Sequence, residues 1–278
     1  MFSSILKNPP LRLFDVTLRD GLQSIPKIYS LTEKMELGLD IVANKNPRAI
    51  EIGSVVSHKT VPQMKNSLDF FQSFSASYGM SNNLDIYVLT PNLKNTQIAI
   101  NHSVCNYSFI TSVSNMFQTK NTNLTIGDTK NELKNMIDLV KTTREDNKIK
   151  LYISCVAECP IIGKINNHTI LHEIMYYYHT HGEHISNLCL SDTCGTLRFS
   201  DFKFIIDSLL EKGVELEHFG LHLHQQVSRD NVKNIIIYGM KNGISQYDVS
   251  YIPEIGGCSV TMNNPSGNLG YEAIYDCL

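Results

Sequence analysis

Long apolar runs are missing from this 278-residue chain. No segment approaches the roughly 20 apolar residues that a membrane-spanning helix needs, so we expect no membrane insertion. Residues 1–10 have neither the apolar centre of a secretory signal nor the Arg-rich amphipathic character of a transit peptide. The final Tyr-Asp-Cys-Leu matches neither a prenylation box nor a peroxisomal signal. These absences favour a cytoplasmic protein.

An excess of positive charge is also missing, because 24 Lys and Arg face 27 Asp and Glu, for a net charge of -3. Nucleic-acid-binding domains carry a strongly basic face, so we expect no nucleic-acid partner. A disulfide framework is not indicated either, because seven cysteines in a chain of this length is an odd and sparse set. We expect free thiols that pack as small apolar residues, with Cys258 as the exception discussed below.

Strand and helix patterns alternate along the whole chain. The helix patterns begin after the capping box Ser30-Leu31-Thr32-Glu33, where the first helix runs to the stop at Asn44–Pro47. The predicted strands are Phe14–Leu18, Ala49–Gly53, Leu84–Leu89, Tyr107–Ser112, Ile149–Cys155, Asn187–Leu190, Phe219–Leu223 and Tyr247–Ile252. The further helices are Val61–Phe74, Lys94–Asn101, Lys130–Thr143, Thr169–His181, Phe202–Leu210, Val232–Lys241 and Pro265–Cys277.

Eight strands that alternate with eight helices predict a single (β/α)₈ TIM barrel, for which the usual length is about 250 residues. An open doubly wound sheet is the alternative. That fold usually has a Gly-rich phosphate loop after its first strand, and Arg19-Asp20-Gly21-Leu22-Gln23 is not such a loop. The chain has no linker or low-complexity tract, so we predict one domain over residues 1–278.

Polar residues gather where the predicted strands end, which in a barrel is the catalytic end. Arg19 and Asp20 follow the first strand, and Asp192 follows the sixth. His222 and His224 lie two apart in the seventh strand, so both imidazoles project to one side. With Asp20 they predict a metal site of mixed nitrogen and oxygen ligands, which suits Mg²⁺ or Mn²⁺, with Zn²⁺ as an alternative.

Two further features bear on the site. Glu51 lies between apolar neighbours in the second strand, where a buried charge needs a partner. Cys258 follows Gly256-Gly257, a pair that suits a mobile loop able to bring a thiol over the mouth as a general acid or base. A structural loop with an incidental thiol is the alternative. The His-rich stretch His179–His184 falls at a helix end on the far side of the barrel, and we expect it to be a solvated helix end.

Several motifs together resemble those of the 3-hydroxy-3-methylglutaryl-CoA lyase family, from about Leu11 to the end of the chain. They are DVTLRDGLQ, AIEIGSVVSHKTVPQM, VLTPNLK, YISCVAECPIIGKI, LSDTCG, GLHLH and GGC…SGNLGYE. The TLRDG and HxH motifs alone would also fit isopropylmalate or citramalate synthases. The resemblance implies a metal-dependent carbon–carbon lyase that cleaves an acyl-CoA thioester, 3-hydroxy-3-methylglutaryl-CoA, to acetoacetate and acetyl-CoA. It also implies a homodimer.

The resemblance also implies roles for individual residues. The metal ligands would be Asp20, His222, His224 and Asn268. Arg19 would stabilise an enolate and be oriented by Glu51, and Cys258 would exchange protons with help from His222 and Asp192. The remaining assignments are Gln23, Ser54 and Thr193 beside the substrate and Glu272 in support of the ligands.

The chain departs from the family pattern at two places. Gln225 stands where the lyases have aspartate, and the segment from Cys258 to Asn268 reads differently and is one residue longer. Two alternatives therefore stay open: a related barrel enzyme with another substrate, and a barrel that binds ligand without turnover.

Overall fold

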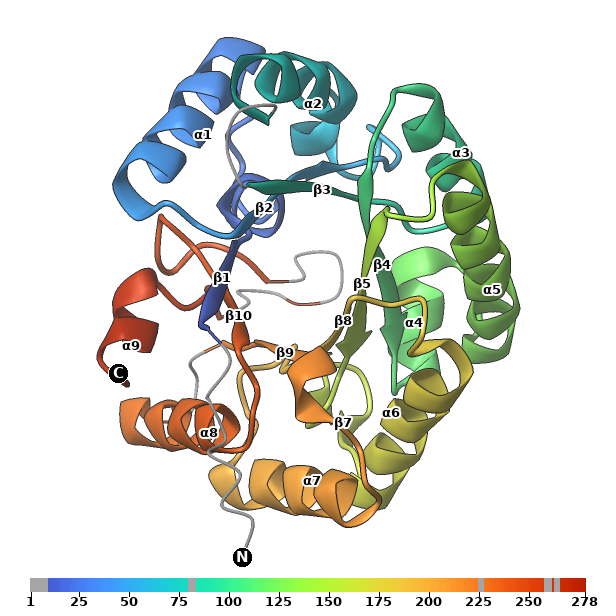
Figure 1. Cartoon of the computed structure of the whole chain (residues 1–278), viewed down its shortest axis with the longest axis vertical. Coiled ribbons are helices and arrows are strands. Elements are labelled where there is room, and N and C mark those ends of the chain that lie inside the picture. Colours follow the sequence, from blue (N-terminus) through green and yellow to red (C-terminus); the bar gives the residue numbers. More distant parts are fainter. Residues whose placement is uncertain (1–9, 80–83, 225–227, 258–261, 263–265) are drawn as a thin grey trace, which may run out of the picture.

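The structure is a computed structural model that describes residues 10–79, 84–224, 228–257, 262 and 266–278. Eight parallel strands close into a barrel that is ringed by helices, as Figure 1 shows in a view into the barrel. Around the barrel the strand order is β1-β10-β9-β8-β5-β4-β3-β2. The predicted TIM-barrel fold class is confirmed.

The barrel strands differ little from the predicted ranges, except for the first. They are β1 Arg12–Asp15, β2 Ala49–Ser54, β3 Asp85–Leu89, β4 Asn106–Ser112, β5 Lys148–Ser154, β8 Asn187–Ser191, β9 Phe219–His222 and β10 Gln246–Val249. The α-helices are α1 Leu31–Lys45, α2 Ser67–Phe74, α3 Leu93–Asn101, α4 Asn115–Thr122, α5 Ile126–Thr143, α6 Asn167–His181, α7 Phe199–Glu211, α8 Arg229–Lys241 and α9 Tyr271–Tyr275. The capping box predicted at Ser30 and Glu33 is confirmed.

The structure corrects four of the predicted elements. The first strand ends at Asp15, and a π-helical turn, η1, follows at Thr17–Gly21. The helix predicted over Val61–Phe74 is a 3₁₀ turn at Pro62–Met64 followed by α2. Of the segment expected to be helical, Pro265–Cys277, the described residues from 266 onward form a helix only in α9, and α5 starts four residues before Lys130.

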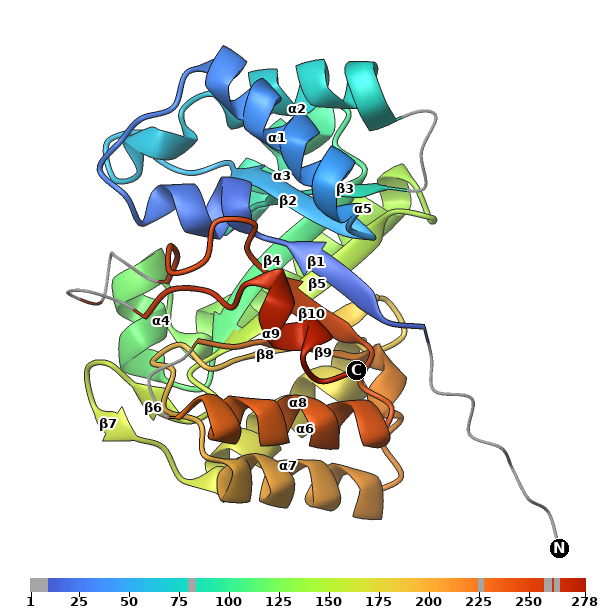
Figure 2. The ribbon, with the colours of Figure 1, turned by 90° about the vertical axis from the view of Figure 1, so that its left-hand side faces the viewer.

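Two elements were not predicted. Helix α4 and the hairpin of β6 (Glu158–Cys159) and β7 (Gly163–Lys164) both follow barrel strands. In the side view of Figure 2 they lie at the end toward which β1 points, the carboxyl end of the strands. They therefore enlarge the end of the barrel that carries the polar residues.

The apolar core lies mainly between the barrel and its helices. One large cluster joins outward-facing strand residues such as Ile50, Ile52 and Leu151 to helix residues such as Ile41 and Phe70. A membrane-spanning helix is not found, since every helix in the described ranges is too short or too polar.

The inside of the barrel has a different composition. Two small apolar clusters, around Phe14 with Tyr87 and around Leu89 with Tyr152, are separate from the main core. Charged side chains from β2, β5 and β10 are buried among them, namely Glu51, Lys150 and Asp248. Buried charges are costly unless they are paired, so the interior of the barrel has to be organised by ion pairs and hydrogen bonds.

Candidate metal centre and active site

At the end of β1, the side chain of Asp15 helps to turn the backbone toward the site. The Asp15 carboxylate accepts a hydrogen bond from the Thr17 amide at 2.9 Å, and Gly21 N donates to Val16 O across five residues. Side-chain bonds of this kind compete with a continued strand, and π turns are frequent at functional sites. The turn buries both Arg19 and Asp20 at the mouth of the barrel.

Arg19 is held by two carboxylates. Its Nε donates to Glu51, and its Nη1 lies 2.6 Å from Asp20 Oδ1. Tyr152 donates its hydroxyl to Glu51 at 3.2 Å and places its ring 5.2 Å from the guanidinium carbon of Arg19. Burial alone would lower the pKa of Arg19, but Glu51 and Asp20 raise it, so a fixed cation faces the mouth.

The second oxygen of Asp20 meets the segment after β10. Asp20 Oδ2 accepts from the Gly257 amide at 2.8 Å and from Asn268 Nδ2 at 3.0 Å. Gly256 has a φ of +124°, and a Cβ there would lie 2.1 Å from Asn268 Nδ2. A glycine is thus needed at position 256 for close approach to Asp20 and Asn268.

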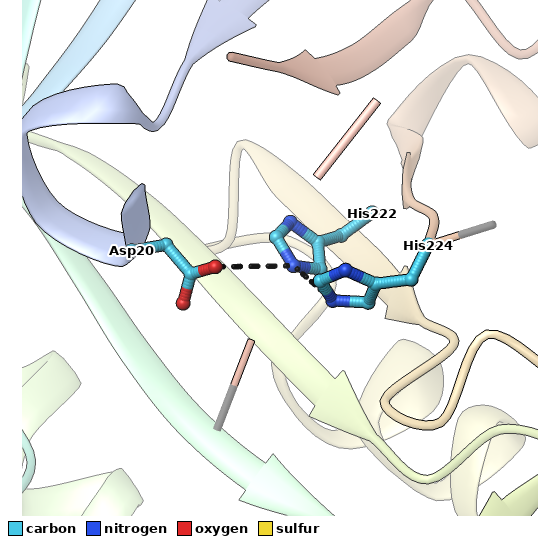
Figure 3. A group of neighbouring side chains, drawn as sticks. All are labelled: Asp20, His222 and His224. Atoms are coloured by element: carbon cyan, nitrogen blue, oxygen red, sulfur yellow. Dashed lines mark hydrogen bonds and ion pairs between the residues drawn. The ribbon is translucent and has the colours of Figure 1, made fainter. Parts of the chain in front are cut away.

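His222 and His224 complete the group, which Figure 3 shows with Asp20. His222 Nδ1 is 3.0 Å from Asp248 Oδ2, and His224 Nδ1 is 3.0 Å from the carbonyl oxygen of Gly267. Their two Nε2 atoms are 3.1 Å apart, and His222 Nε2 is 4.0 Å from Asp20 Oδ2. All three side chains are buried, with one ligand atom from each within 4.8 Å of the others.

The protonation states of Asp20 and His224 suit this group to binding a cation. Burial would raise the pKa of Asp20, but Arg19 and the two histidines hold it below its ordinary value. Burial and His222 lower the pKa of His224 to about 4, so this imidazole is neutral at pH 7. Because Gly267 O can only accept, His224 carries its proton on Nδ1 and offers a lone pair at Nε2.

Asn268 supplies a fourth candidate ligand atom. Its Oδ1 is buried and has no hydrogen-bond partner among the described residues. Buried polar atoms nearly always have a hydrogen-bond partner. A buried oxygen without one, beside a carboxylate and two imidazoles, therefore fits the role of a cation ligand. The donors are oxygen and nitrogen without thiolate, which suits Mg²⁺, Mn²⁺ or Zn²⁺.

A cleft of about 960 Å³ opens from these residues. Arg19, Asp20 and both histidines line it, together with the predicted substrate neighbours Gln23, Ser54 and Thr193. The cleft continues past the ends of β2, β3 and β4 to α3 and α4. Its volume is at the upper end of the range for small-molecule sites.

Asp192 lies behind the cleft. Its two carboxylate oxygens accept the amides of Thr196 and Leu197, each at 3.0 Å. Burial raises the pKa of Asp192 to about 7, against the opposing effect of those amides and of His222. A carboxyl group with such a pKa can hold or release a proton near neutral pH.

One predicted site residue is not brought to this group, and another cannot be placed. Glu272 lies on α9 with its side chain 75% exposed and pairs with Lys45 at 2.9 Å, so the structure does not support a place for it beside the metal ligands. Cys258 lies outside the described residues.

Sequence reasoning missed three residues of the site: Lys150, Tyr152 and Asp248. Tyr152 holds Glu51, Asp248 holds His222, and Lys150 pairs with Asp248. The sequence feature that could have identified them is the one that identified Glu51, a charged or polar residue inside an otherwise apolar strand. Burial and Lys150 act in opposite directions on Asp248, and the pKa of Asp248 is lowered overall.

The His-rich stretch at the end of α6 forms no such group. His179 and His184 are exposed, as predicted, whereas His181 is buried, contrary to the prediction of a wholly solvated end. Within the described residues, the only other candidate cluster for a metal is Glu215, Glu217 and His218, where the glutamates are exposed.

The chain is similar to curated lyases. The chain is 27% identical over 263 residues to mitochondrial hydroxymethylglutaryl-CoA lyase of Homo sapiens, with 94% of this chain and 76% of the relative covered. It is 26% identical over 271 residues to the 3-hydroxy-3-isohexenylglutaryl-CoA/hydroxymethylglutaryl-CoA lyase of Pseudomonas aeruginosa, covering 95% and 83%.

Solved structures show the same fold. An HMG-CoA lyase of Acinetobacter baumannii, in complex with coenzyme A and 3-methylmalate, matches with a TM-score of 0.83 at 22% identity, over 97% of this chain and 83% of that one. The hydroxymethylglutaryl-CoA lyase of Pseudomonas aeruginosa matches with a TM-score of 0.80 at 25% identity, over 96% and 84%. The family model HMGL-like matches residues 10–259, and this chain therefore belongs to the HMGL-like family.

Proposed function

We propose that this chain is a metal-dependent carbon–carbon lyase that cleaves 3-hydroxy-3-methylglutaryl-CoA to acetoacetate and acetyl-CoA, with residues 1–278 as one catalytic domain. One observation carries the proposal. The cation-binding group of Asp20, His222 and His224 shares a cleft with the buried guanidinium of Arg19. Cleavage of a bond beta to a thioester needs both a polarised hydroxyl group and a cation for the enolate.

Asp20, His222, His224 and Asn268 Oδ1 would hold the metal, with Mg²⁺ or Mn²⁺ preferred and Zn²⁺ as an alternative. When bound, a divalent cation would acidify the 3-hydroxyl of the substrate. The neutral His224 and the ionised Asp20 are already in the protonation states that ligation requires. Metal binding therefore demands no proton release from these two side chains at pH 7.

Arg19 would stabilise the charge that develops during cleavage. When the C2–C3 bond breaks, its electron pair passes to C2 and is delocalised onto the thioester oxygen, while C3 becomes the ketone of acetoacetate. A preorganised cation stabilises such an enolate strongly. Glu51 would orient Arg19, and Tyr152 in turn holds Glu51.

Two proton transfers complete the reaction: the hydroxyl loses a proton, and the enolate carbon gains one to give acetyl-CoA. We assign them to Cys258 with help from Asp192. His222 was the other predicted helper. However, its Nδ1 is bonded to Asp248 and its Nε2 faces the cation position, so ligation would leave neither nitrogen free for proton transfer.

The rest of the cleft suits an acyl-CoA thioester. Its outer part carries Lys65, Lys94 and Lys120, cations that can pair with phosphate groups. Gln23, Ser54 and Thr193 lie on its wall near the metal position and would contact the acyl part. A homodimer is proposed from the family resemblance alone.

A second candidate is a related substrate with a longer acyl substituent. The Pseudomonas aeruginosa relative is named for both isohexenylglutaryl and methylglutaryl thioesters. In this chain apolar side chains, Leu89, Ile98, Ile110 and Phe117, line the cleft beyond the polar group. A longer apolar substituent would bury surface against them.

The test measures acetoacetate release from 3-hydroxy-3-methylglutaryl-CoA with Mg²⁺, with Mn²⁺ and with EDTA. We expect metal-dependent cleavage that is lost in Cys258→Ala and His224→Ala but kept in the control His184→Ala. Parallel assays with a longer 3-alkyl thioester separate the two candidate substrates. Folded, metal-bound protein that cleaves neither thioester would overturn the lyase proposal and favour a non-catalytic barrel.

A further inference from the structure

A chain of three charged or titratable side chains crosses the inside of the barrel. It runs from Lys150 on β5 to Asp248 on β10 and on to His222 on β9. Strands β5 and β10 are not neighbours in the barrel, so the first link spans the interior. Lys150 Nζ pairs with Asp248 Oδ1, and Asp248 Oδ2 lies 3.0 Å from His222 Nδ1.

Lys150 and Asp248 are shielded from solvent, so water cannot take the place of either partner. Their side chains are 2% and 3% exposed. The ammonium of Lys150 lies 3.5 Å from the ring centroid of Phe14 and 4.6 Å from that of Tyr152, both aromatic faces. A buried ammonium group needs a carboxylate as its partner, and the buried carboxylate likewise depends on the lysine.

This pairing decides which nitrogen of His222 carries the proton. A carboxylate beside a lysine ammonium can only accept, so His222 must donate from Nδ1. In the neutral ring Nε2 then carries the lone pair, and it is directed toward His224 Nε2 at 3.1 Å and Asp20 Oδ2 at 4.0 Å. The opposite tautomer would place a proton on Nε2, where the cation belongs.

We propose that Asp248 and Lys150 are positioning residues of the metal site: Asp248 fixes His222 as the Nδ1–H tautomer, and Lys150 holds the carboxylate of Asp248 in place. This inference rests on the proposed metal role of His222. Carboxylates that bond the second nitrogen of a ligating histidine are a general feature of metal sites, and their loss weakens metal binding about 10- to 100-fold.

The first experiment needs no variant of the chain. Long-range ¹H–¹⁵N spectra of the metal-free wild-type protein report the tautomer of each histidine, with the His222 signals assigned by their loss in His222→Gln. We expect His222 as the Nδ1–H form. The Nε2–H form would overturn the proposal.

The second experiment replaces the pair by apolar side chains of similar size, Lys150→Met with Asp248→Leu, because such exchanges are often tolerated in protein interiors. We expect Mn²⁺ affinity, measured by electron paramagnetic resonance, to fall about 10- to 100-fold. The single variant Lys150→Arg keeps a positive charge beside Asp248. Its Mn²⁺ affinity should stay within about threefold of wild type, well inside the loss expected on removing the pair. Unchanged Mn²⁺ affinity in the folded double variant would overturn the proposal.

The matched control is Lys148→Met with Asp85→Leu, a second lysine–aspartate pair whose lysine is also on β5, two residues before Lys150, and which does not contact His222. Its Mn²⁺ affinity should equal that of wild type. If the Lys150/Asp248 double variant does not fold, the tautomer of the wild-type protein decides the question. Neither measurement uses substrate, so failure of this inference is distinct from failure of the proposed reaction.

Discussion

The two ends of the barrel carry similar sets of charges in different surroundings. At the carboxyl end, Arg19 pairs with Asp20 and Glu51, and none of the three side chains is more than 8% exposed. At the amino end, Asp85 pairs with Lys148 at 2.7 Å and Arg48 at 3.5 Å, and these side chains are 22–41% exposed. Burial, not residue type, separates the two sets.

The difference shows what each set can do. Half-exposed pairs share their hydrogen bonds with water and contribute little to stability. The buried set must be satisfied from within, yet Glu51 Oε1 and Asn268 Oδ1 have no partner among the described residues. An incomplete buried network at the catalytic end of a barrel points to a ligand, whereas the amino end of the barrel generally serves stability.

The largest expected effect is the loss of a metal ligand at the carboxyl end. His224→Ala should weaken Mn²⁺ binding by more than about 100-fold, beyond the range seen when only a supporting residue is lost. Cleavage should fall with it. The measurement is a Mn²⁺ titration followed by steady-state kinetics at saturating metal. Equal metal affinity in His224→Ala and wild type would remove this histidine from the ligand set.

The next effect tests the two arginines against each other. Arg19→Met should lower kcat by about 10²- to 10³-fold, the usual loss when one preorganised group for a developing anion is removed. Arg48→Met, its counterpart at the amino end, should leave kcat within about twofold, because an exposed ion pair has little influence beyond its surroundings. Similar losses in both variants would mean that Arg19 acts through stability and not through the enolate.

Asp15 gives a third environment, a buried carboxylate with no cation among the partners that hold it. Tyr271 donates to it at 2.8 Å and Thr17 N at 2.9 Å, and burial raises the pKa of Asp15 to about 6. Between about pH 4 and 6 the unfolded chain loses this proton while the folded chain keeps it, so stability falls as pH rises. The two-unit difference corresponds to about 2–3 kcal/mol.

Asp15→Asn should remove that part of the pH dependence, as seen by urea unfolding at pH 4.0, 5.0 and 6.5. Asp85→Asn is the matched control, because this carboxylate is half-exposed and paired with two cations. This variant should keep the wild-type dependence of stability on pH. If the wild-type slope persists in Asp15→Asn, the carboxyl group of Asp15 is not its source.

The sequence predicted the barrel because alternating strand and helix periods are local signals. It predicted the first strand wrongly for a reason that is also physical. Phe14, Val16 and Leu18 alternate as in a strand, but the bond from Thr17 N to Asp15 turns the chain after four strand residues. Every residue of the turn is buried, so the pattern of apolar residues does not distinguish this turn from a strand.

The candidate site was predictable where polar residues stand at strand ends, as for Asp20, His222 and His224. Lys150 and Asp248 lie inside strands, and their pairing across the barrel depends on closure, which no local pattern encodes. The family resemblance implies Glu272 in support of the metal ligands, within the helix predicted over Pro265–Cys277. In the structure the chain forms isolated bridges at Asn268 and Gly270, and α9 begins only at Tyr271, which leaves Glu272 facing Lys45.

The smallest expected effect closes the comparison. Lys148→Met should lower the free energy of unfolding by less than about 1 kcal/mol, because water can replace the ammonium beside Asp85. Lys150→Met, two residues along the same strand, should lower it by about 3–5 kcal/mol, because Asp248 is then a buried charge without its cation. Urea unfolding of both variants at pH 7 measures the contrast. Equal losses would mean that burial does not separate the two pairs, and that Asp248 inside the barrel needs its cation no more than the half-exposed Asp85 does.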